Sequence, residues 1–223
     1  MKIDIITLHP DMFGPLQSSI IGRAQENGIV DINLINLRDF GLGRYRQVDD
    51  TPYGGGAGMV LRADVIKAAV DSVRTKDSRV LLMDPIGVPF KQSKAQSLTM
   101  EDHLIFICGH YEGVDARIRD TVTDELISIG DFILTGGELA TMVVVDSVVR
   151  LIPEVLGNHE SLSEESFNND LLEAPVYTRP SEFMGITVPD ILLSGHHKKI
   201  EEYRNAESIR LTEKHRPDLL KNS

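Results

Sequence analysis

The segment GDFILTGG, residues 130–137, places large apolar side chains inside a glycine-rich turn. Phenylalanine, isoleucine and leucine are unusual choices for a loop that water surrounds on all sides. Glycine lets the backbone approach a ligand closely, and ligand pockets are mostly apolar with a few polar groups. The segment therefore predicts a wall for a flat, partly apolar ligand. Two other glycine-containing segments, PIGVPF (85–90) and GHYEGVD (109–115), are candidates for the same site.

A further glycine-rich segment, PYGGGAGM at 52–59, has backbone N–H groups that could face an anion. It is not a Walker loop, because no Gly-Lys-Ser/Thr follows, and no strand leads directly into it as in a dinucleotide-binding fingerprint. A flexible loop without a ligand is the alternative interpretation. The flanking residues, VDDTP and MVLRAD, favour a mobile cover that becomes ordered when a partner binds.

The histidines do not form a recognisable metal site. HYEG, at 110–113, contains the His-x-Glu of a zinc deaminase but lacks the Pro-Cys-x-x-Cys, since Cys108 is the single cysteine. His196 and His197 are adjacent, so they lie on different faces of a helix and do not form an i, i+4 pair of ligands. We therefore predict no metal, and we expect these histidines to be caps or contact residues.

The segment after the apolar turn predicts a helix over 136–152. Thr135 and Glu138 have the spacing of a capping box, which predicts that they cap this helix. The helix is apolar almost all round, so it is expected to be buried on every side, in a homodimer interface or a deep core. Asp146 and Arg150 are i, i+4 partners, and a structural ion pair is the simplest interpretation.

The elements that must position these residues alternate along the chain. Short apolar strands separated by helical segments predict an α/β fold with a mostly parallel sheet. Ligands bind beyond the carboxyl ends of such strands, which is where the three glycine-containing segments begin. The predicted strands are 3–8, 30–37, 79–84, 103–108 and 125–129, and the predicted helices are about 15–27, 62–75, 91–100, 115–122 and 136–152.

The pattern changes after Pro153. Residues 157–170 are polar and acidic without apolar periodicity, which predicts a flexible linker between a main domain, 1–156, and a small helical domain, 171–223. Ser194 is a candidate N-cap for the helix of this second domain. The last domain is too small to bury much core of its own, so we expect it to pack on something else.

Composition leaves the class of partner open. The net charge of −11 argues against nucleic acid, but arginines cluster near residues 38–46 and lysines and arginines recur over 196–221. No apolar run is long enough to span a bilayer, and the first residues are typical of a strand and not of a signal peptide. With one cysteine as well, the sequence predicts a cytoplasmic protein without a membrane partner.

Seven segments taken together resemble the bacterial tRNA (guanine-37-N1)-methyltransferases, the TrmD family, over nearly the whole chain. They are PYGGGAGM, GHYEGVD, SIGDFILTGGELA, RLIPEVLGN, EESF, YTRP and LLSGHH, in this order. The resemblance implies a SPOUT-like fold with a trefoil knot in the C-terminal half of the main domain. It also implies an antiparallel homodimer, in which the linker and the C-terminal domain of one subunit close over the cofactor of the other.

The resemblance further implies that S-adenosylmethionine binds, bent, in the knot. Apolar side chains would sandwich the adenine, while backbone groups would contact its polar edges. The residues implied at the cofactor are Pro85, Gly87, Gly109, Glu112, Ile129, Gly130, Asp131, Phe132, Ile133, Leu134, Gly136 and Gly137.

Methylation of guanine N1 requires a base for the N1 proton and a cation for the charge that develops on O6. The positions matching the family's catalytic pair are Glu165, where the family has Asp, and Arg150. Asp170, and then Glu164 and Glu160, are the alternative bases. His110 replaces the usual Arg and is mostly neutral near pH 7. The expected phosphate contacts are Arg44, Arg46, Arg179, Lys198 and Lys199.

The function predicted from this resemblance is S-adenosylmethionine-dependent methylation of N1 of guanine 37, in tRNAs that also have guanine at position 36. Two alternatives stay open. One is a knotted RNA methyltransferase with a different target. The other is a cofactor-binding RNA module without catalysis, in which Glu165 and Arg150 are ordinary surface groups.

Overall fold

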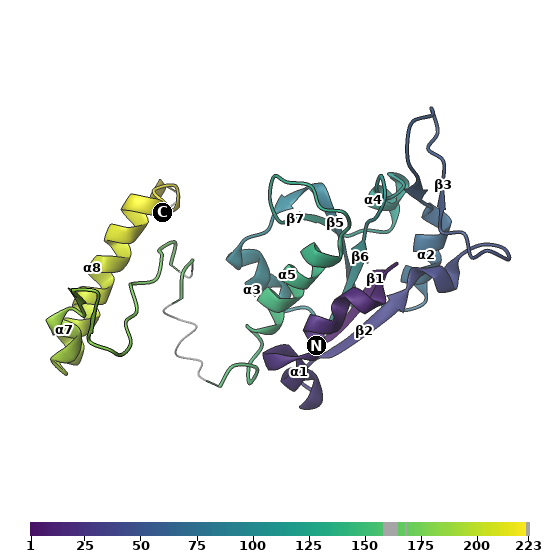
Figure 1. Cartoon of the computed structure of the whole chain (residues 1–223). Coiled ribbons are helices and arrows are strands. Elements are labelled where there is room, and N and C mark those ends of the chain that lie inside the picture. Colours follow the sequence, from purple (N-terminus) through teal and green to yellow (C-terminus); the bar gives the residue numbers. More distant parts are fainter. Residues whose placement is uncertain (158–164, 168, 222–223) are drawn as a thin grey trace. The chain divides into compact units, whose positions relative to one another are not determined.

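A computed structural model describes residues 1–157, 165–167 and 169–221 of the chain (Figure 1). The chain divides into two compact units, Met1–Gly157 and Asn158–Ser223, and each is described here by itself.

The first unit is built on a parallel sheet of five strands in the order β2-β1-β6-β5-β7. The α/β fold with a parallel sheet that the sequence predicts is therefore confirmed. The knot stays a prediction. The strands are β1 (Lys2–Thr7), β2 (Asp31–Asn36), β5 (Ser78–Pro89), β6 (His103–Cys108) and β7 (Glu125–Ser128).

Strand β5 is longer than predicted, because it continues through the segment that was expected to leave the sheet as a loop. Its register against β7 shifts between Met83 and Val88, and pairing then resumes at Val88 and Pro89. Gly87 makes this possible, since a Cβ atom there would lie 2.5 Å from the backbone nitrogen of Ile127. The glycine thus serves strand packing, which the sequence pattern did not indicate.

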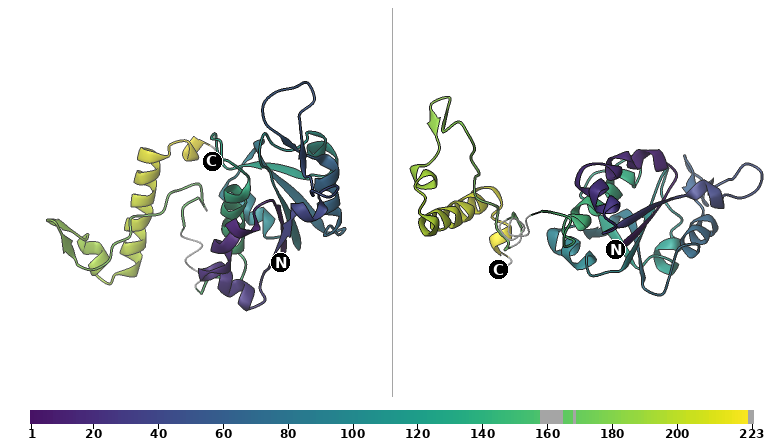
Figure 2. Two further views of the ribbon diagram at one scale, coloured as in Figure 1. Left: turned by 45° about the vertical axis from the view of Figure 1, so that its right-hand side comes forward. Right: turned by 90° about the horizontal axis from the view of Figure 1, so that it is seen from below.

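Helices cover both faces of the sheet, because neighbouring residues of each strand point to opposite faces and both sets are apolar (Figure 2). Ile5 and Phe106 belong to one core and Ile6 and Ile107 to the other. On the first face lie the 3₁₀ helix η1 (Pro10–Gln17) and the helices α1 (Ser19–Glu26), α3 (Gln92–Leu98) and α5 (Glu138–Val149). On the second lie η2 (Leu37–Phe40), α2 (Ala63–Asp71) and α4 (Arg117–Thr121).

Helix α5 is not buried on every side by this unit's own core, because Leu139 and Val143, one turn apart, are each 48% exposed in the single chain. Burial in a homodimer interface, the other expectation for this helix, stays a prediction. The expected capping box is wrong, because the N-cap of α5 is Gly137 without a side-chain hydrogen bond. The Glu138 side chain is buried and instead accepts a hydrogen bond from Thr7 Oγ1, at 2.9 Å.

Two very short strands lie in the connection between η2 and α2. β3 (Asp49–Asp50) pairs antiparallel with β4 (Val60–Leu61), and together they frame the glycine-rich loop 51–59. Two residue pairs are too few for the hydrophobic alternation by which a sequence pattern identifies a strand.

The second unit contains a hairpin and one long helix. Its elements are β8 (Glu182–Phe183), β9 (Ile186–Thr187), α7 (Asp190–Leu193), α8 (His197–His215) and η3 (Leu219–Lys221). Ser194 ends α7 and does not begin α8, so the expected N-cap is wrong. Among the described residues, no helix combines the length and apolar character needed to cross a membrane.

The described part of residues 165–173 packs against α8. Leu172 N–H donates to Thr212 Oγ1 at 2.9 Å, and the Arg216 guanidinium lies 5.7 Å from the Phe167 ring centroid. Thr212 is buried by these contacts. The other residues of the predicted linker after Gly157, 158–164 and 168, lie outside the described residues.

Candidate functional site

A cavity of about 300 Å³ opens at the carboxyl ends of β6 and β7, where the fold class predicts a ligand. Its walls come from residues 83–85 within β5, from the segment after β6 and from the segment between β7 and α5. Two of the three segments that the sequence pattern assigned to one site form these walls, and of the third, 85–90, only Pro85 takes part. The structure therefore brings together residues that are distant in the chain, from Met83 to Ala140.

Most residues predicted at the cofactor line this cavity. They are Pro85, Gly109, Glu112, Ile129, Gly130, Phe132, Ile133, Leu134, Gly136 and Gly137. Two do not line it. Gly87 packs on the backbone of β7, and Asp131 is exposed outside the cavity wall. The sequence pattern missed Met83, Asp84, Ile127, Ser128 and Ala140, which also line the cavity and lie just outside the predicted segments.

Gly137 allows the start of α5 to cross the end of β6 at close range. Its N–H donates to the Gly109 carbonyl at 2.8 Å, and a Cβ atom at this position would lie 2.9 Å from Cys108 Cα and from Gly109 N. Real Cβ atoms do not approach backbone so closely, so any side chain would separate the two segments. The shape of the cavity therefore depends on glycine at position 137, where the segment before α5 contacts the end of β6 directly.

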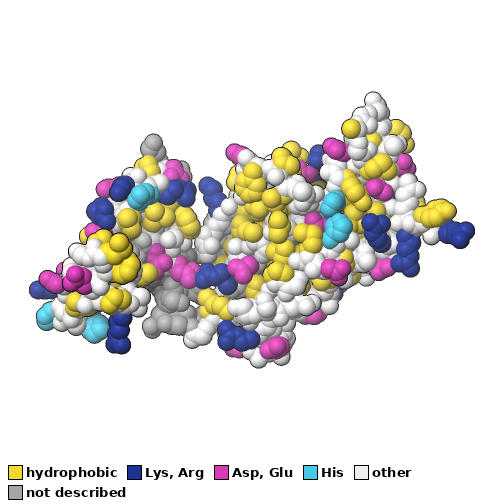
Figure 3. All heavy atoms as spheres, in the orientation of Figure 1, with side chains coloured by type: hydrophobic (Ala, Val, Ile, Leu, Met, Phe, Trp, Pro, Cys, Tyr) yellow, Lys and Arg dark blue, Asp and Glu magenta, His cyan; other side chains and the backbone are white. Residues whose placement is uncertain are grey.

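Two apolar side chains in the cavity wall between β7 and α5 are exposed to solvent. Ile133 is 82% exposed and Phe132 is 54% exposed in the single chain. Figure 3 shows hydrophobic side chains gathered in a band on the face of the first unit that carries α5. Exposed apolar groups around a cavity are typical of a surface that a ligand or another protein covers.

Beneath the wall lies a buried polar contact that holds the turn. Thr7, at the end of β1, donates to Glu138 and accepts a hydrogen bond from His9 N–H at 2.9 Å. A Cβ atom on Gly136 would lie 2.3 Å from Glu138 Oε2, so this carboxyl group lies directly beside the wall. The His9 and His110 rings lie near it, with centroids 4.8 Å apart.

Cys108 is close to the cavity but is not a nucleophile. Burial raises the pKa of its thiol far above the ordinary value, although the hydrogen bond with Thr141 Oγ1, at 3.2 Å, acts in the opposite direction. The neutral thiol is a packing group between β6 and α5.

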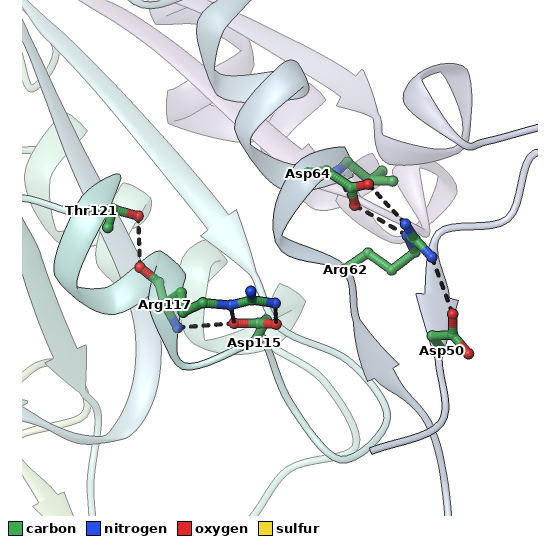
Figure 4. Close-up of polar contacts among 7 residues, drawn as sticks. Asp50, Arg62, Asp64, Asp115, Arg117 and Thr121 are labelled. Carbon is green, nitrogen blue, oxygen red and sulfur yellow. Dashed lines mark hydrogen bonds and ion pairs between the residues drawn. The ribbon is translucent and has the colours of Figure 1, made fainter. Parts of the chain in front are cut away.

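The glycine-rich loop 51–59 reaches the cavity through Glu112. Glu112 N–H donates to the Met59 carbonyl at 3.0 Å, and Gly58, with φ of +85°, leaves no room for a Cβ atom beside the Glu112 side chain. At the base of the loop, Arg62 hydrogen-bonds with Asp50 and Asp64 (Figure 4). The hydrogen bond from Arg62 lowers the pKa of the Asp64 carboxyl below its usual range.

The two predicted catalytic residues belong to different units. Arg150 follows the last residue of α5 in the first unit, and Glu165 lies in the second unit; both are half-buried. Among the alternative bases, Asp170 is exposed with φ of +54°, whereas Glu160 and Glu164 lie outside the described residues.

The predicted phosphate contacts are all exposed, as a role in binding RNA requires. Arg44 lies in the turn after η2, and Lys198 and Lys199 lie in the first turn of α8. Arg46 forms an ion pair with Asp39 at 2.8 Å, which offsets part of its charge. Arg179 precedes Pro180 near the β8–β9 hairpin. Within the described residues, no group of three or more His, Cys, Asp or Glu could hold a metal ion.

Comparison with known proteins gives concordant matches. Residues 1–222 match the protein family described as tRNA (Guanine-1)-methyltransferase TrmD. The chain is 56% identical, over 220 residues, to the tRNA (guanine-N(1)-)-methyltransferase of Streptococcus pyogenes serotype M4, strain MGAS10750, covering 99% of this chain and 91% of the relative. It is 55% identical over 220 residues to the protein of the same name from Streptococcus pyogenes serotype M1, covering 99% and 90%.

Proposed function

Because the chain belongs to the tRNA (guanine-1)-methyltransferase TrmD family and is a tRNA guanine-N1 methyltransferase, we propose that its target is guanine 37 and that its methyl donor is S-adenosylmethionine. We further propose that the substrate tRNAs have guanine at position 36 as well. The observation that carries the proposal is the cavity at the carboxyl ends of β6 and β7 and beside residues 83–85 of β5, with its apolar, glycine-rich wall.

The residues present fit this cofactor. The volume of about 300 Å³ lies at the lower end of the range for small-molecule sites. Gly137 forms a cradle that a Cβ atom would fill. Ile129, Ile133 and Leu134 offer apolar contact to a flat ring, and the Glu112 carboxylate is a suitable partner for a cationic group. When bound, the cofactor supplies an activated methyl group.

In the proposed mechanism, the chain's own residues prepare the acceptor. Guanine N1 carries a proton at neutral pH, and its lone pair becomes available for the methyl group when that proton leaves. Glu165 accepts the proton, and the Arg150 guanidinium stabilises the negative charge that moves onto O6. A glutamate is one methylene longer than the family's aspartate, but its carboxylate provides the same base.

We also propose that the protein is a homodimer. The support is the half-exposed apolar pair Leu139 and Val143 on one face of helix α5, together with the exposed apolar side chains of the cavity wall. A dimer would give these side chains a partner surface. Val143→Glu should then yield a monomeric mass by light scattering at micromolar concentration, whereas Met100→Glu, at another exposed apolar position of the same unit, should not. A monomeric wild-type protein that methylates tRNA contradicts this proposal.

The target is tested with unmodified tRNA transcripts and labelled methyl donor. We expect incorporation into a transcript with guanine at 36 and 37, and none when guanine 37 is replaced by adenine. Incorporation that persists without guanine 37 favours a knotted RNA methyltransferase with another target. Binding of both cofactor and tRNA without incorporation favours a non-catalytic module. Since its substrate is tRNA, we propose that the protein acts in the cytoplasm.

A further inference from the structure

Arg62 connects two segments at the base of the glycine-rich loop (Figure 4). Its Nε and Nη2 donate to the two carboxylate oxygens of Asp64 at 3.1 and 2.8 Å, and its Nη1 donates to Asp50 Oδ2 at 3.1 Å. Its backbone N–H donates to the Val48 carbonyl at 2.9 Å. One guanidinium thus ties β3, which enters the loop, to the first turn of α2, which follows it.

The strand pairing at the base of this loop is short. Strands β3 and β4 contribute two residue pairs. Gly54, Gly55, Gly56 and Gly58 all have positive φ, and glycine is the residue that loses most conformational freedom when it is ordered. A planar guanidinium with a bidentate contact fixes direction as well as distance, so Arg62 restrains the entry of the loop more than a single charge would.

The opposite side of the loop rests on the cavity. The Leu61 N–H donates to the Gly113 carbonyl and the Asp115 N–H donates to the Leu61 carbonyl, both at 3.0 Å. Met59 and Gly58 contact Glu112, which lines the cavity. Residues 51–59 themselves do not line it. The loop that Arg62 restrains therefore contacts the cavity wall from outside, through Glu112, and contributes no side chain to the cavity interior.

We propose that Arg62 is a positioning residue for tRNA methylation, which orders loop 51–59 beside the Glu112 wall before the RNA binds. This inference rests on the proposed function, and its structural basis is that residues 58 and 59 lie against Glu112 while the loop leaves the cavity interior free. A loop that is already ordered does not have to be ordered on binding, so the ordering cost does not reduce the affinity for tRNA. The effect should appear in the KM for tRNA and not in the affinity for the cofactor.

Arg74 provides a matched control. It lies just beyond the other end of α2 and makes an equivalent bridge, with two hydrogen bonds to Asp124 at 3.0 and 3.2 Å and one to the Val122 carbonyl at 2.9 Å. Its side chain is 34% exposed, against 29% for Arg62. Replacing either arginine therefore removes a similar set of hydrogen bonds from the fold, but only Arg62 lies at the base of the glycine-rich loop.

The experiment compares Arg62→Gln, Arg62→Lys and Arg74→Gln in the full-length protein. Steady-state kinetics give kcat and the KM for tRNA, calorimetry gives cofactor affinity, and amide hydrogen exchange reports the order of residues 51–59. We expect Arg62→Gln to raise the KM for tRNA about tenfold and to speed exchange in the loop, with kcat and cofactor affinity within about twofold of wild type. Arg62→Lys should be intermediate, since it keeps the charge but loses the bidentate contact.

Three results would overturn the proposal. An unchanged KM and unchanged loop exchange in Arg62→Gln would show that the bridge does not order the loop. An equal rise of KM in Arg74→Gln would show a general structural effect. A fully wild-type Arg62→Lys would show that charge alone matters.

If Arg62→Gln does not fold, Asp64→Asn breaks the same bidentate contact from the other side. Failure of the wild-type protein to methylate tRNA would count against the proposed function, whereas loop exchange still tests the bridge.

Discussion

The two units of this chain differ in how completely they bury their own side chains. In the first unit, both faces of the sheet carry an apolar core, and the cavity is built where its strands end. In the second, Thr212 is the single buried side chain among the described residues, while Val176, Met184 and Ile186 are at least 73% exposed. A unit with its own core can hold a cavity of fixed shape, whereas a unit without one needs a partner surface.

This difference separates the proposed donor site from the proposed base, although the proposed cation, Arg150, lies in the first unit. The residues for the methyl donor lie in the first unit, and their geometry is set by backbone contacts such as that of Gly137 with Gly109. The proposed base, Glu165, lies in the second unit. We therefore expect changes at the cavity wall to affect cofactor affinity, and changes at Glu165 to affect the methylation rate.

The largest effect should come from the second unit. Glu165→Gln keeps the shape of the side chain but removes the base, so it should lower the single-turnover methylation rate by about 10²–10⁴-fold. Cofactor affinity should stay at the wild-type value, because Glu165 does not line the cavity. Rapid-quench measurement with excess enzyme gives the rate, and calorimetry gives the affinity.

Two further variants identify the base. Glu165→Asp should retain more activity than Glu165→Gln, since it shortens the reach but keeps the carboxylate. Asp170→Asn should be close to wild type. If Asp170→Asn is inactive and Glu165→Gln is active, the base is Asp170. If both stay active, a carboxylate at these positions is not the base.

The next largest effect should come from the cavity wall. Gly137→Ala places a Cβ atom 2.9 Å from the backbone of β6, and overpacking of this kind costs about 1–3 kcal/mol. We expect the affinity for S-adenosylmethionine, measured by calorimetry, to fall by about 10- to 100-fold. The control is Gly14→Ala, where no atom lies within 4 Å of the added Cβ. Wild-type cofactor affinity in Gly137→Ala would contradict the proposal that this cavity binds S-adenosylmethionine.

The smallest effect should come from the surface of the second unit. Replacing Lys198 and Lys199 by alanine removes two proposed phosphate contacts. The slope of log affinity for tRNA against log salt concentration should then decrease by about 0.7–0.9 for each lost contact. Lys67→Ala serves as the control, since Lys67 forms an ion pair with Asp71 in the first unit. An unchanged slope in the double variant would place the phosphate contacts elsewhere.

The sequence predicts the sheet well because its strands are continuous apolar runs, which leave a signal in any short window. It predicts most of the cavity for a related reason, since each wall is one contiguous segment. It fails where the partner is distant in sequence. Glu138 matches a capping box locally, but its hydrogen-bond partner, Thr7, is 131 positions away. A local pattern contains no information about that contact.

The same limitation explains the other errors. Gly87 looks like a loop residue because glycine in a short motif indicates a turn, whereas its function is to pass against the backbone of Ile127 in a neighbouring strand. The local sequence does not indicate the bridging role of Arg62, because an arginine between Leu61 and Ala63 belongs to no recognisable motif. Its significance appears only when Asp50 and Asp64 are brought to it from both sides.

The strand order carries a consequence for synthesis of the chain. The ribosome makes β1 early, but β1 lies between β2 and β6, and Lys2 pairs with His103. One edge of β1 therefore stays without its native partner until more than a hundred residues have emerged. Folding that depends on such distant pairing is slow, and an open strand edge on a nascent chain favours aggregation. We expect the growing chain to need protection by chaperones until β6 is released from the exit tunnel.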